Sequence, residues 1–472
     1  MWLIAFTTVS QAVSWVSTLI VARLLVPADY GLMAMATILT GYVQVFYTMG
    51  IGSAIVQRRE VTDDELSSVF WALLFWGTAL GSLCFALAYP TVAIFDEPGL
   101  FRVTQAVSVL FILGTAVVVP STLLKRDMRF KAVGLVTSTS VLVSCLSMIL
   151  MAYLGAGVWT LLGGHIIRTA VELGMALAVT RWRPRLHFSH QETKPYLRFG
   201  LPLAGANSLN YLYRRSPDFF GGRAFSATGL GYYSMAIQLS HIPNDKILSV
   251  ITSVAYPVFS KIQSDDWECR RFYLRLSQLV GFIVMPIYCG AFFVAGDVIP
   301  LVLGPQWEQT VLPFQILCLA MLVSTLARPN ELINTAQGRP HWGFWFNLAN
   351  ALTMVPTFYV AATWGSPGYL AVPWLLLNAP AYVVFAGVTM RKIGVSPRAL
   401  LEHLQAPLAA TVTMLVVLVG LRYLFAPSVG LVPIAQIPYV AMIVLSGMTY
   451  YSAWLFLRER AFLNEILRLA RA

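Results

Sequence analysis

Two stretches of this chain, RLLVPADYGLMAMAT at residues 23–37 and RAFSATGLGYYSMAI at residues 223–237, align at an offset of 200 residues. Four positions are identical: Arg23 and Arg223, Gly31 and Gly231, Met35 and Met235, and Ala36 and Ala236. An internal repeat of this kind predicts two halves of like architecture, and parallel repeats in a transporter place the substrate site between the halves. The same alignment pairs Met1 with Leu201, so YLRFG (196–200) lacks a counterpart. This suggests that the natural protein starts a few residues before Met1.

Composition places the chain among polytopic helical membrane proteins. Its 472 residues are 58% hydrophobic and 11% charged, with a mean hydropathy of +0.70. A soluble domain carries roughly 25% charged residues. The net charge of +11 would suggest nucleic-acid binding in a soluble protein. In a membrane protein it reflects Lys and Arg retained on the cytoplasmic side, so we expect no nucleic-acid partner.

Apolar runs of about 18–25 residues predict membrane-spanning helices. About 14 such runs follow one another, near 2–22, 31–55, 68–94, 103–123, 132–153, 157–180, 197–220, 227–257, 273–298, 311–334, 342–363, 368–390, 404–425 and 434–457. We therefore predict an all-α membrane protein with a six-helix N-terminal lobe (1–195), a six-helix C-terminal lobe (196–398) and two further helices (399–472).

The connections between these runs alternate in charge. Of the 32 Lys and Arg residues, 23 lie in or beside one set of connections, 3 lie in the other set and 6 lie within the runs. Because positive charge accumulates on the cytoplasmic side, the pattern predicts a multi-pass protein of the bacterial cytoplasmic (inner) membrane with both termini in the cytoplasm.

Several functional classes lack the features that they require. The connections are too short for a nucleotide-binding or glycosyltransferase domain, and neither a GxxxxGK[ST] motif nor a Rossmann glycine pattern occurs. The five cysteines have no paired spacing, which supports neither a disulfide framework nor a metal site. We expect a protein that is not an enzyme and that uses no cofactor and no metal.

The most polar segment within an apolar run is NSLNYLYRRSPDFFGGR at 207–223. Helical spacing places four of its side chains on one face: Asn207, Asn210, Arg214 and Asp218. Charged groups in a membrane span face a protein interior or a wet cavity, so we interpret this face, with Arg215, as one wall of an anion-binding cavity. The alternative is that the membrane-embedded part ends at Tyr213, with Pro217 as the breaker. Asp218 either neutralises Arg214 or acts as a protonatable coupling group.

Two further spans carry polar residues. In span 227–257, Asp245 follows a predicted kink at Pro243 and either contributes to a transport site or pairs with Lys246. In span 311–334, Arg328 and Glu331 are three residues apart and can pair locally, although a cavity role is equally open for Arg328. The candidates for ion coupling are Asp218, Asp245 and Glu331. The candidates for substrate binding are Arg214, Arg215, Asn207, Asn210, Arg223, Arg23 and Arg328.

Seven segments spread over the first ten predicted helices carry a family resemblance: RLLVPADYGLMAMAT, GIGSAIVQRREVTDDELSSVFW, LLKRDMRFKA, GVWTL, RWRPRLHF, GYYSMAIQLSHIPNDKI and LGPQWEQTVLPFQIL. Together they resemble the bacterial polysaccharide transporter (Wzx-type) flippases of the multidrug/oligosaccharidyl-lipid/polysaccharide superfamily. Arg23 and Arg223 look like the arginine that commonly closes the first helix of each lobe in this family. The chain departs from the family at its start, where relatives usually carry a basic stretch.

The resemblance implies a flippase that moves undecaprenyl-pyrophosphate-linked oligosaccharide repeat units across the cytoplasmic membrane for lipopolysaccharide or exopolysaccharide synthesis. It implies alternating access coupled to an ion gradient, and it implies membrane lipids, a polysaccharide polymerase and export machinery as partners. Arginine suits such a cargo because its planar fork donates two parallel hydrogen bonds to phosphate.

Two other functional classes fit less well. A cation-coupled multidrug antiporter of the same superfamily usually has twelve spans and an acidic residue in the first, whereas span 2–22 contains no carboxylate. A membrane enzyme such as an O-antigen ligase or polymerase needs a sizeable outer loop, and the outer connections here are short.

Overall fold

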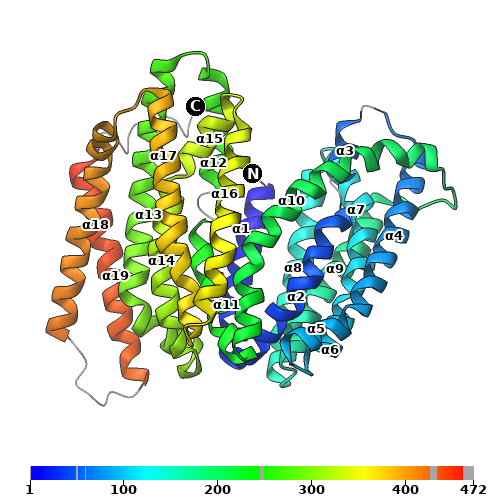
Figure 1. Ribbon diagram of the computed structural model, residues 1–472, viewed down its shortest axis with the longest axis horizontal. Helices are drawn as coiled ribbons and strands as arrows, with labels where there is room; N and C mark the ends of the chain where they lie inside the picture. The colour runs from blue at the N-terminus through cyan, green and yellow to red at the C-terminus, as the bar shows by residue number, and fades with distance from the viewer. Residues whose placement is uncertain (1, 49–50, 59, 245–248, 426–432, 461–472) are drawn as a thin grey trace. The chain divides into compact units, whose positions relative to one another are not determined.

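The structure is a computed structural model that describes residues 2–48, 51–58, 60–244, 249–425 and 433–460 (Figure 1). Every regular element within those residues is helical, and no β-strand occurs among them. The prediction of an all-α fold is therefore confirmed.

The helices follow one another with short connections. The first ten are α1 Trp2–Leu24, α2 Pro27–Thr48, α3 Ile51–Gln57, α4 Asp63–Ala86, α5 Ala88–Phe95, α6 Leu100–Val107, α7 Val109–Arg126, α8 Phe130–Tyr153, α9 Val158–Thr180 and α10 His190–Ala224. The others are α11 Ala227–Pro243, α12 Ser249–Ile262, α13 Asp266–Leu303, α14 Val311–Leu326, α15 Arg328–Ala336, α16 Pro340–Ala362, α17 Ala379–Ile393, α18 Pro397–Phe425 and α19 Pro433–Arg458. Three short 3₁₀ or π segments cover Pro305–Thr310, Pro367–Ala371 and Trp374–Asn378.

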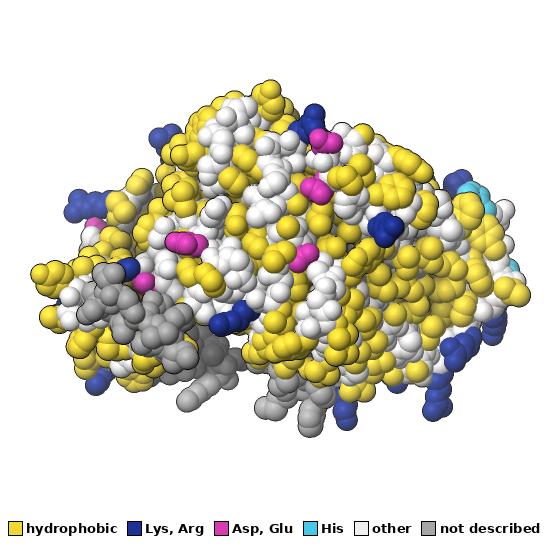
Figure 2. Space-filling view, turned by 90° about the horizontal axis from the view of Figure 1, so that it is seen from below, with side chains coloured by type: hydrophobic (Ala, Val, Ile, Leu, Met, Phe, Trp, Pro, Cys, Tyr) yellow, Lys and Arg dark blue, Asp and Glu magenta, His cyan; other side chains and the backbone are white. Residues whose placement is uncertain are grey.

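The apolar helices match the predicted spans. Nine helical segments in the described part of the chain are long and apolar enough to cross a membrane. The pair Ser10–Leu24 and Pro27–Val43 passes the same test together and bends by 115°. Each predicted apolar run coincides with one helix or with consecutive helices, and hydrophobic side chains cover much of the face in Figure 2. The protein is therefore a multi-pass membrane protein, as predicted.

Acidic residues begin two helices at corresponding places in the repeat. The Thr62 side chain accepts a hydrogen bond from the backbone of Glu65, which bonds back to the Thr62 backbone and completes a capping box at the start of α4. At the start of α13, the Asp265 side chain accepts from the backbone N–H groups of Trp267 and Glu268. Carboxylates are favourable there because the N-terminus of a helix carries a partial positive charge.

Two compact units are distinguished by their contacts. Unit 1 comprises Met1–Ser234 with Gly365–Pro367, and unit 2 comprises Met235–Trp364 with Gly368–Ala472. α11 therefore begins in unit 1 and continues in unit 2. The lobe boundaries that the repeat suggests stay a prediction.

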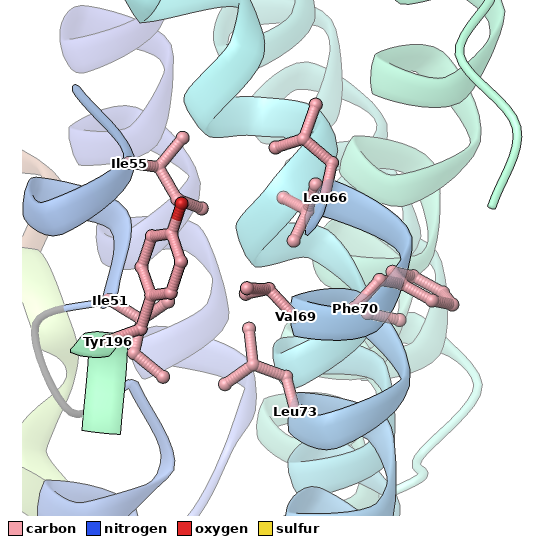
Figure 3. Packing of buried hydrophobic residues seen from close by; sticks show 9 residues of the cluster. Ile51, Ile55, Leu66, Val69, Phe70, Leu73 and Tyr196 are labelled. Carbon is pink, nitrogen blue, oxygen red and sulfur yellow. The ribbon is translucent and has the colours of Figure 1, made fainter. Parts of the chain in front are cut away.

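Unit 1 is held together by contacts between α10 and the helices that precede it, and by contacts among those helices. α1 packs on α8, α8 on α9, α7 on α4 and α9, and α10 on α2, α3, α4 and α5. Tyr196, near the start of α10, lies in a buried cluster with Ile51 and Ile55 of α3 and with apolar residues of α4 (Figure 3). The long helix that carries the polar segment is therefore packed within unit 1.

Unit 2 is built on α13. This helix packs against α14, α18 and α19, and Phe282, Met414 and Ile443 belong to the buried cluster that joins three of these helices. The Tyr451 hydroxyl donates to the backbone oxygen of Phe282 over 2.7 Å. α18 and α19 are thereby attached to the rest of the unit.

Two repeat-related glycines allow backbone-to-backbone contact in unit 1. α2 begins at Pro27 and α11 at Ala227, at the same offset of 200 residues that aligns the sequences. A Cβ atom on Gly31 would overlap the carbonyl oxygen of Ala227, and a Cβ atom on Gly231 would overlap the carbonyl oxygen of Pro27. The contact is therefore reciprocal, and each copy of the repeat supplies one glycine and one carbonyl.

We predict that Gly31→Ala and Gly231→Ala each destabilise the protein. The added methyl group meets backbone that cannot rotate away, and overpacking of this kind costs about 1–3 kcal/mol. The measurement is the folded fraction that remains after heating in detergent, followed by size-exclusion chromatography. Gly174→Ala in α9 is the control, because a Cβ there meets nothing within 4 Å. Equal melting of all three variants would contradict the close contact.

Candidate functional site

The polar segment 207–223 lies in one continuous helix. α10 runs from His190 to Ala224 without ending at Tyr213 or Pro217. Pro217 therefore does not interrupt the helix, and that part of the alternative is wrong. The helix continues past both residues to Ala224 and so includes Asp218 and Arg223.

Three side chains of α10 form the centre of the candidate site: Tyr211, Arg215 and Asp218. Nη1 of Arg215 donates to Oδ2 of Asp218 over 2.8 Å. The Arg215 guanidinium lies 5.9 Å from the centre of the Tyr211 ring, within the range of a cation–π interaction. The Tyr211 hydroxyl donates to the backbone oxygen of Thr37 over 2.7 Å and lies 3.1 Å from that of Ile38. The three side chains thus connect α10 to α2, and we call them the α10 triad.

The ion pair in the α10 triad is asymmetric. The Asp218 side chain is 6% exposed, whereas that of Arg215 is 43% exposed. A buried carboxylate is unfavourable without a counter-ion, so Asp218 depends on Arg215. The guanidinium has five N–H donors, and its exposed part retains donors for a further acceptor. The triad therefore combines a buried negative charge with an accessible positive one.

Glycines bring the neighbouring helices close to the triad. A Cβ on Gly41 of α2 would overlap the hydroxyl of Tyr211, so this position leaves room only for hydrogen. Near the end of α10, a Cβ on Gly222 would lie 2.9 Å from the ring of Phe95 in α5. The Phe95 ring also meets that of Phe219 with 5.9 Å between centroids. α2 therefore packs closely on Tyr211 of the triad, and α5 packs closely on the part of α10 that follows Asp218.

The arginine that we considered as the partner of Asp218 is off by one residue. Asp218 pairs with Arg215, three residues earlier, and not with Arg214. Arg214 is exposed, and among the described residues no hydrogen bond or ion pair reaches it. The side chains of Asn207 and Asn210 lie outside the described residues. Tyr211 was missed, although its spacing to Arg215 and Asp218 (i, i+4, i+7) indicates a shared face.

The other predicted site residues occupy separate places. Arg23 and Arg223 lie in the last turns of α1 and α10, and both are exposed. Asp245 lies outside the described residues. Arg328 begins α15 in unit 2, where its Nη1 donates to Oε2 of Glu331 over 2.7 Å. The predicted local pairing of Arg328 and Glu331 is therefore confirmed.

The asparagines beside Arg328 hold helices together. The Tyr273 hydroxyl of α13 donates to Oδ1 of Asn330 over 2.9 Å. Nδ2 of Asn334 donates to the hydroxyl of Thr389 in α17 over 2.8 Å. Both asparagines are buried, and these bonds give them a structural role.

One ion pair joins two spans that the sequence did not connect. Nη1 of Arg422 in α18 lies 3.4 Å from Oδ2 of Asp297 in α13. The same guanidinium lies 5.6 Å from the centre of the Phe293 ring. In the sequence, the sign of this pair is a single charged residue near the end of each of the two apolar spans. Among the described residues, no three His, Cys, Asp or Glu side chains come together to hold a metal ion.

We predict that Arg215→Ala lowers stability more than Asp218→Asn. Removing Arg215 leaves the buried carboxylate of Asp218 without its counter-ion. Breaking a buried pair in this way costs about 3–5 kcal/mol of folding free energy, and the exposure of Arg215 favours the lower end of that range. The double variant Arg215→Ala/Asp218→Asn should recover part of the loss, as measured by thermal unfolding in detergent. Arg214→Ala is the matched control and should be close to neutral. Equal losses for both arginine variants would contradict the assigned pair.

Comparisons with known proteins agree with this architecture. Residues 20–312 match the family model described as "Polysaccharide biosynthesis protein". The chain is 25% identical over 366 residues to the lipopolysaccharide biosynthesis protein WzxC of Escherichia coli strain K12, covering 76% of this chain and 73% of that protein. It is also 25% identical over 472 residues to the succinoglycan biosynthesis transport protein ExoT of Rhizobium meliloti, covering 100% of this chain and 94% of that protein.

A solved structure shares the fold. The lipid II flippase MurJ, in its inward closed conformation, superposes with a TM-score of 0.77 over 98% of this chain and 99% of that chain, at 12% identity. At that identity the likeness concerns the fold alone. The family model covers more than half of the sequence, and the chain therefore belongs to the polysaccharide biosynthesis protein family.

Proposed function

We propose that this protein is a flippase that moves undecaprenyl-pyrophosphate-linked oligosaccharide repeat units across the bacterial cytoplasmic membrane. The observation that carries the proposal is similarity along the whole chain to a protein named for succinoglycan transport, within a family named for polysaccharide biosynthesis. The fold shared with a lipid II flippase is in keeping with such a cargo. The translocated units would serve lipopolysaccharide or exopolysaccharide synthesis, and both termini would lie in the cytoplasm.

The chemistry of the α10 triad suits the pyrophosphate of this cargo. Arg215 offers free N–H donors on its exposed side, and Arg214 is exposed beside it. Two adjacent guanidinium groups can bind several phosphate oxygens at once. We assign the pyrophosphate to Arg214 and Arg215. We assign supporting contacts with the glycan or phosphates to Asn207, Asn210, Arg23, Arg223 and Arg328.

The ion pair of the triad offers a way to couple transport to protons. A pyrophosphate that engages Arg215 competes with Asp218 for the same guanidinium. Asp218 is buried, so its carboxylate would bind a proton once its counter-ion is drawn away. Release of the cargo would restore the pair and expel the proton. Asp218 is accordingly our first candidate for ion coupling, ahead of Asp245 and Glu331.

Deletion of the gene in the native host tests the proposed cargo. The surface polysaccharide should be lost, and the lipid-linked repeat unit should accumulate on the inner leaflet, where an impermeant glycan probe added outside the cell cannot reach it. Extraction and mass spectrometry of the lipid-linked oligosaccharides provide the measurement. A multidrug antiporter would instead leave the polysaccharide intact and change drug tolerance. Absence of any accumulated repeat unit would overturn the flippase proposal.

Variants of the two arginines test the proposed site. Arg214→Ala and Arg215→Ala, expressed in the deletion strain, should block export while the protein is still inserted in the membrane. Arg214→Lys should retain part of the export because it keeps the charge and loses only the fork. Arg102→Ala, an exposed arginine of α6, is the control and should export normally. Full export by both alanine variants and by their double variant would rule out this site.

A further inference from the structure

Residues 181–189 connect α9 to α10 and alternate in character. The segment RWRPRLHFS belongs to no helix or strand and bends at Leu186, and Arg181 has a left-handed backbone conformation with φ 55°. Arg181, Arg183, Arg185 and His187 occupy the odd positions, whereas Trp182, Pro184, Leu186 and Phe188 occupy the even ones. Basic and apolar residues therefore alternate along the segment. We call this segment the strap.

Hydrogen bonds fasten the backbone of the strap to α4. The backbone N–H of Arg185 donates to the hydroxyl of Ser67 over 3.0 Å, and Nε1 of Trp71 donates to the backbone oxygen of Arg185 over 2.7 Å. Further along, the backbone N–H of Ser189 donates to the hydroxyl of Ser68 over 3.1 Å. The strap is therefore presented in a defined position along the side of a membrane-spanning helix.

The attachment points lie about one to two turns inside the N-terminal end of α4. Ser67 and Trp71 follow the first residue of the helix, Asp63, by 4 and 8 residues, which is about 6–12 Å along the axis. Trp71 belongs to the segment that is apolar enough to cross a membrane. The backbone of Arg185 thus lies at the depth where the apolar part of the span begins.

The guanidinium of Arg185 points back toward the N-terminal end of α4. Its guanidinium lies 3.0 Å from the carboxylate of Asp64 and 3.5 Å from that of Asp63, in the first turn of α4. Long basic side chains in a membrane protein take this course when their backbone is deeper than the polar headgroups. The direction of the side chain agrees with the depth given by the hydrogen bonds.

Two large apolar side chains of the strap point away from the protein. The exposed fraction of Leu186 is 95% and that of Phe188 is 61%. Leaving apolar side chains of this size in water is unfavourable. By contrast Trp182 packs on Phe70, with 5.7 Å between ring centroids. Leu186 and Phe188 are therefore largely exposed at a depth where hydrocarbon begins.

Basic side chains of the strap remain available beside them. Arg181 and Arg183 are exposed, and neither forms an ion pair within the part of the chain that the structure describes. A polybasic segment next to a membrane span attracts anionic lipid headgroups. The charge of the strap is thus complementary to a phospholipid surface.

We propose that the strap is a membrane-interface anchor for anionic phospholipid. Leu186 and Phe188 enter the edge of the hydrocarbon layer, and Arg181 and Arg183 bind lipid phosphates at the headgroup level. Interfacial segments bury their apolar side by about 5–10 Å in this way. The anchor does not depend on the identity of the transported cargo.

The anchor also sets the position of the start of α10. The hydroxyl of Ser68 donates to the Glu192 carboxylate over 2.6 Å, and Nη1 of Arg58 donates to the Tyr196 hydroxyl over 3.4 Å. Burial, together with the Glu65 carboxylate, raises the pKa of Tyr196, so its hydroxyl stays neutral at physiological pH. Through Ser68, the strap is therefore connected to Glu192 in the first turn of the helix that carries the α10 triad.

Spin labels at alternating positions of the strap test the anchor. Leu186→Cys and Phe188→Cys place a nitroxide at two apolar positions. Arg183→Cys places one at a basic position and is the matched control. Each labelled full-length protein is reconstituted in nanodiscs of phosphatidylglycerol and phosphatidylcholine. Four of the five native cysteines are buried, and the labelled unmutated protein gives the background signal.

Oxygen, which partitions into hydrocarbon, and a water-soluble nickel chelate report the surroundings of each label. The ratio of oxygen to nickel accessibility should be several-fold higher at 186 and 188 than at 183. High nickel accessibility at 186 and 188 would show that the strap lies in water and would overturn the proposal. Low accessibility to both reagents would show that a protein surface covers the strap, which would also overturn it.

The lipid composition tests the headgroup. In nanodiscs of phosphatidylcholine alone, the accessibility ratio at 186 should fall. Arg181→Gln/Arg183→Gln, combined with the label at 186, should show the lower ratio in both compositions. An unchanged ratio in the two lipids would overturn the assignment of anionic phospholipid.

Discussion

The free energy of a buried carboxylate is the constraint on which the candidate site depends. Asp218 lies inside a membrane protein, so it requires a counter-ion, and Arg215 provides it from the preceding turn. Arg215 in turn lies over Tyr211, and Tyr211 is bonded to the backbone of α2. Gly41 is required because the tyrosine hydroxyl occupies the space of a side chain. The close packing of α10 against α2 follows from these linked requirements.

The positions of the spans could be predicted from the sequence because membrane insertion selects for long apolar runs, and those runs are local. The helix starts at Pro27 and Ala227 agree with the offset of 200 residues, although the apolar run placed the start of the second span near residue 31. The arginine that pairs with Asp218 was placed one residue off, because helical periodicity alone allows both Arg214 and Arg215 to approach Asp218. The tether between Tyr211 and α2, a contact across 174 residues, lies beyond any local pattern.

Other features needed the structure for the same reason. The pair of Asp297 and Arg422 joins spans that are far apart in sequence, and no spacing rule connects them. In the sequence, the basic run that begins at Arg181 contributes only to the charge difference between the two sets of connections. Its hydrogen bonds to Ser67, Ser68 and Trp71 of α4 place it along the side of a span. Charge counts indicate a side of the membrane, whereas depth is set by long-range contacts.

The reciprocal contact of Gly31 and Gly231 has a consequence for how a duplicated chain can diverge. A clash between two side chains can be relieved by a second substitution in the partner. Here the partner of each glycine is a carbonyl oxygen, at Ala227 and at Pro27, and every amino acid carries the same atom. No compensating mutation is available at the partner position in either copy. Divergence after duplication can therefore change the surrounding side chains while both glycines stay in place.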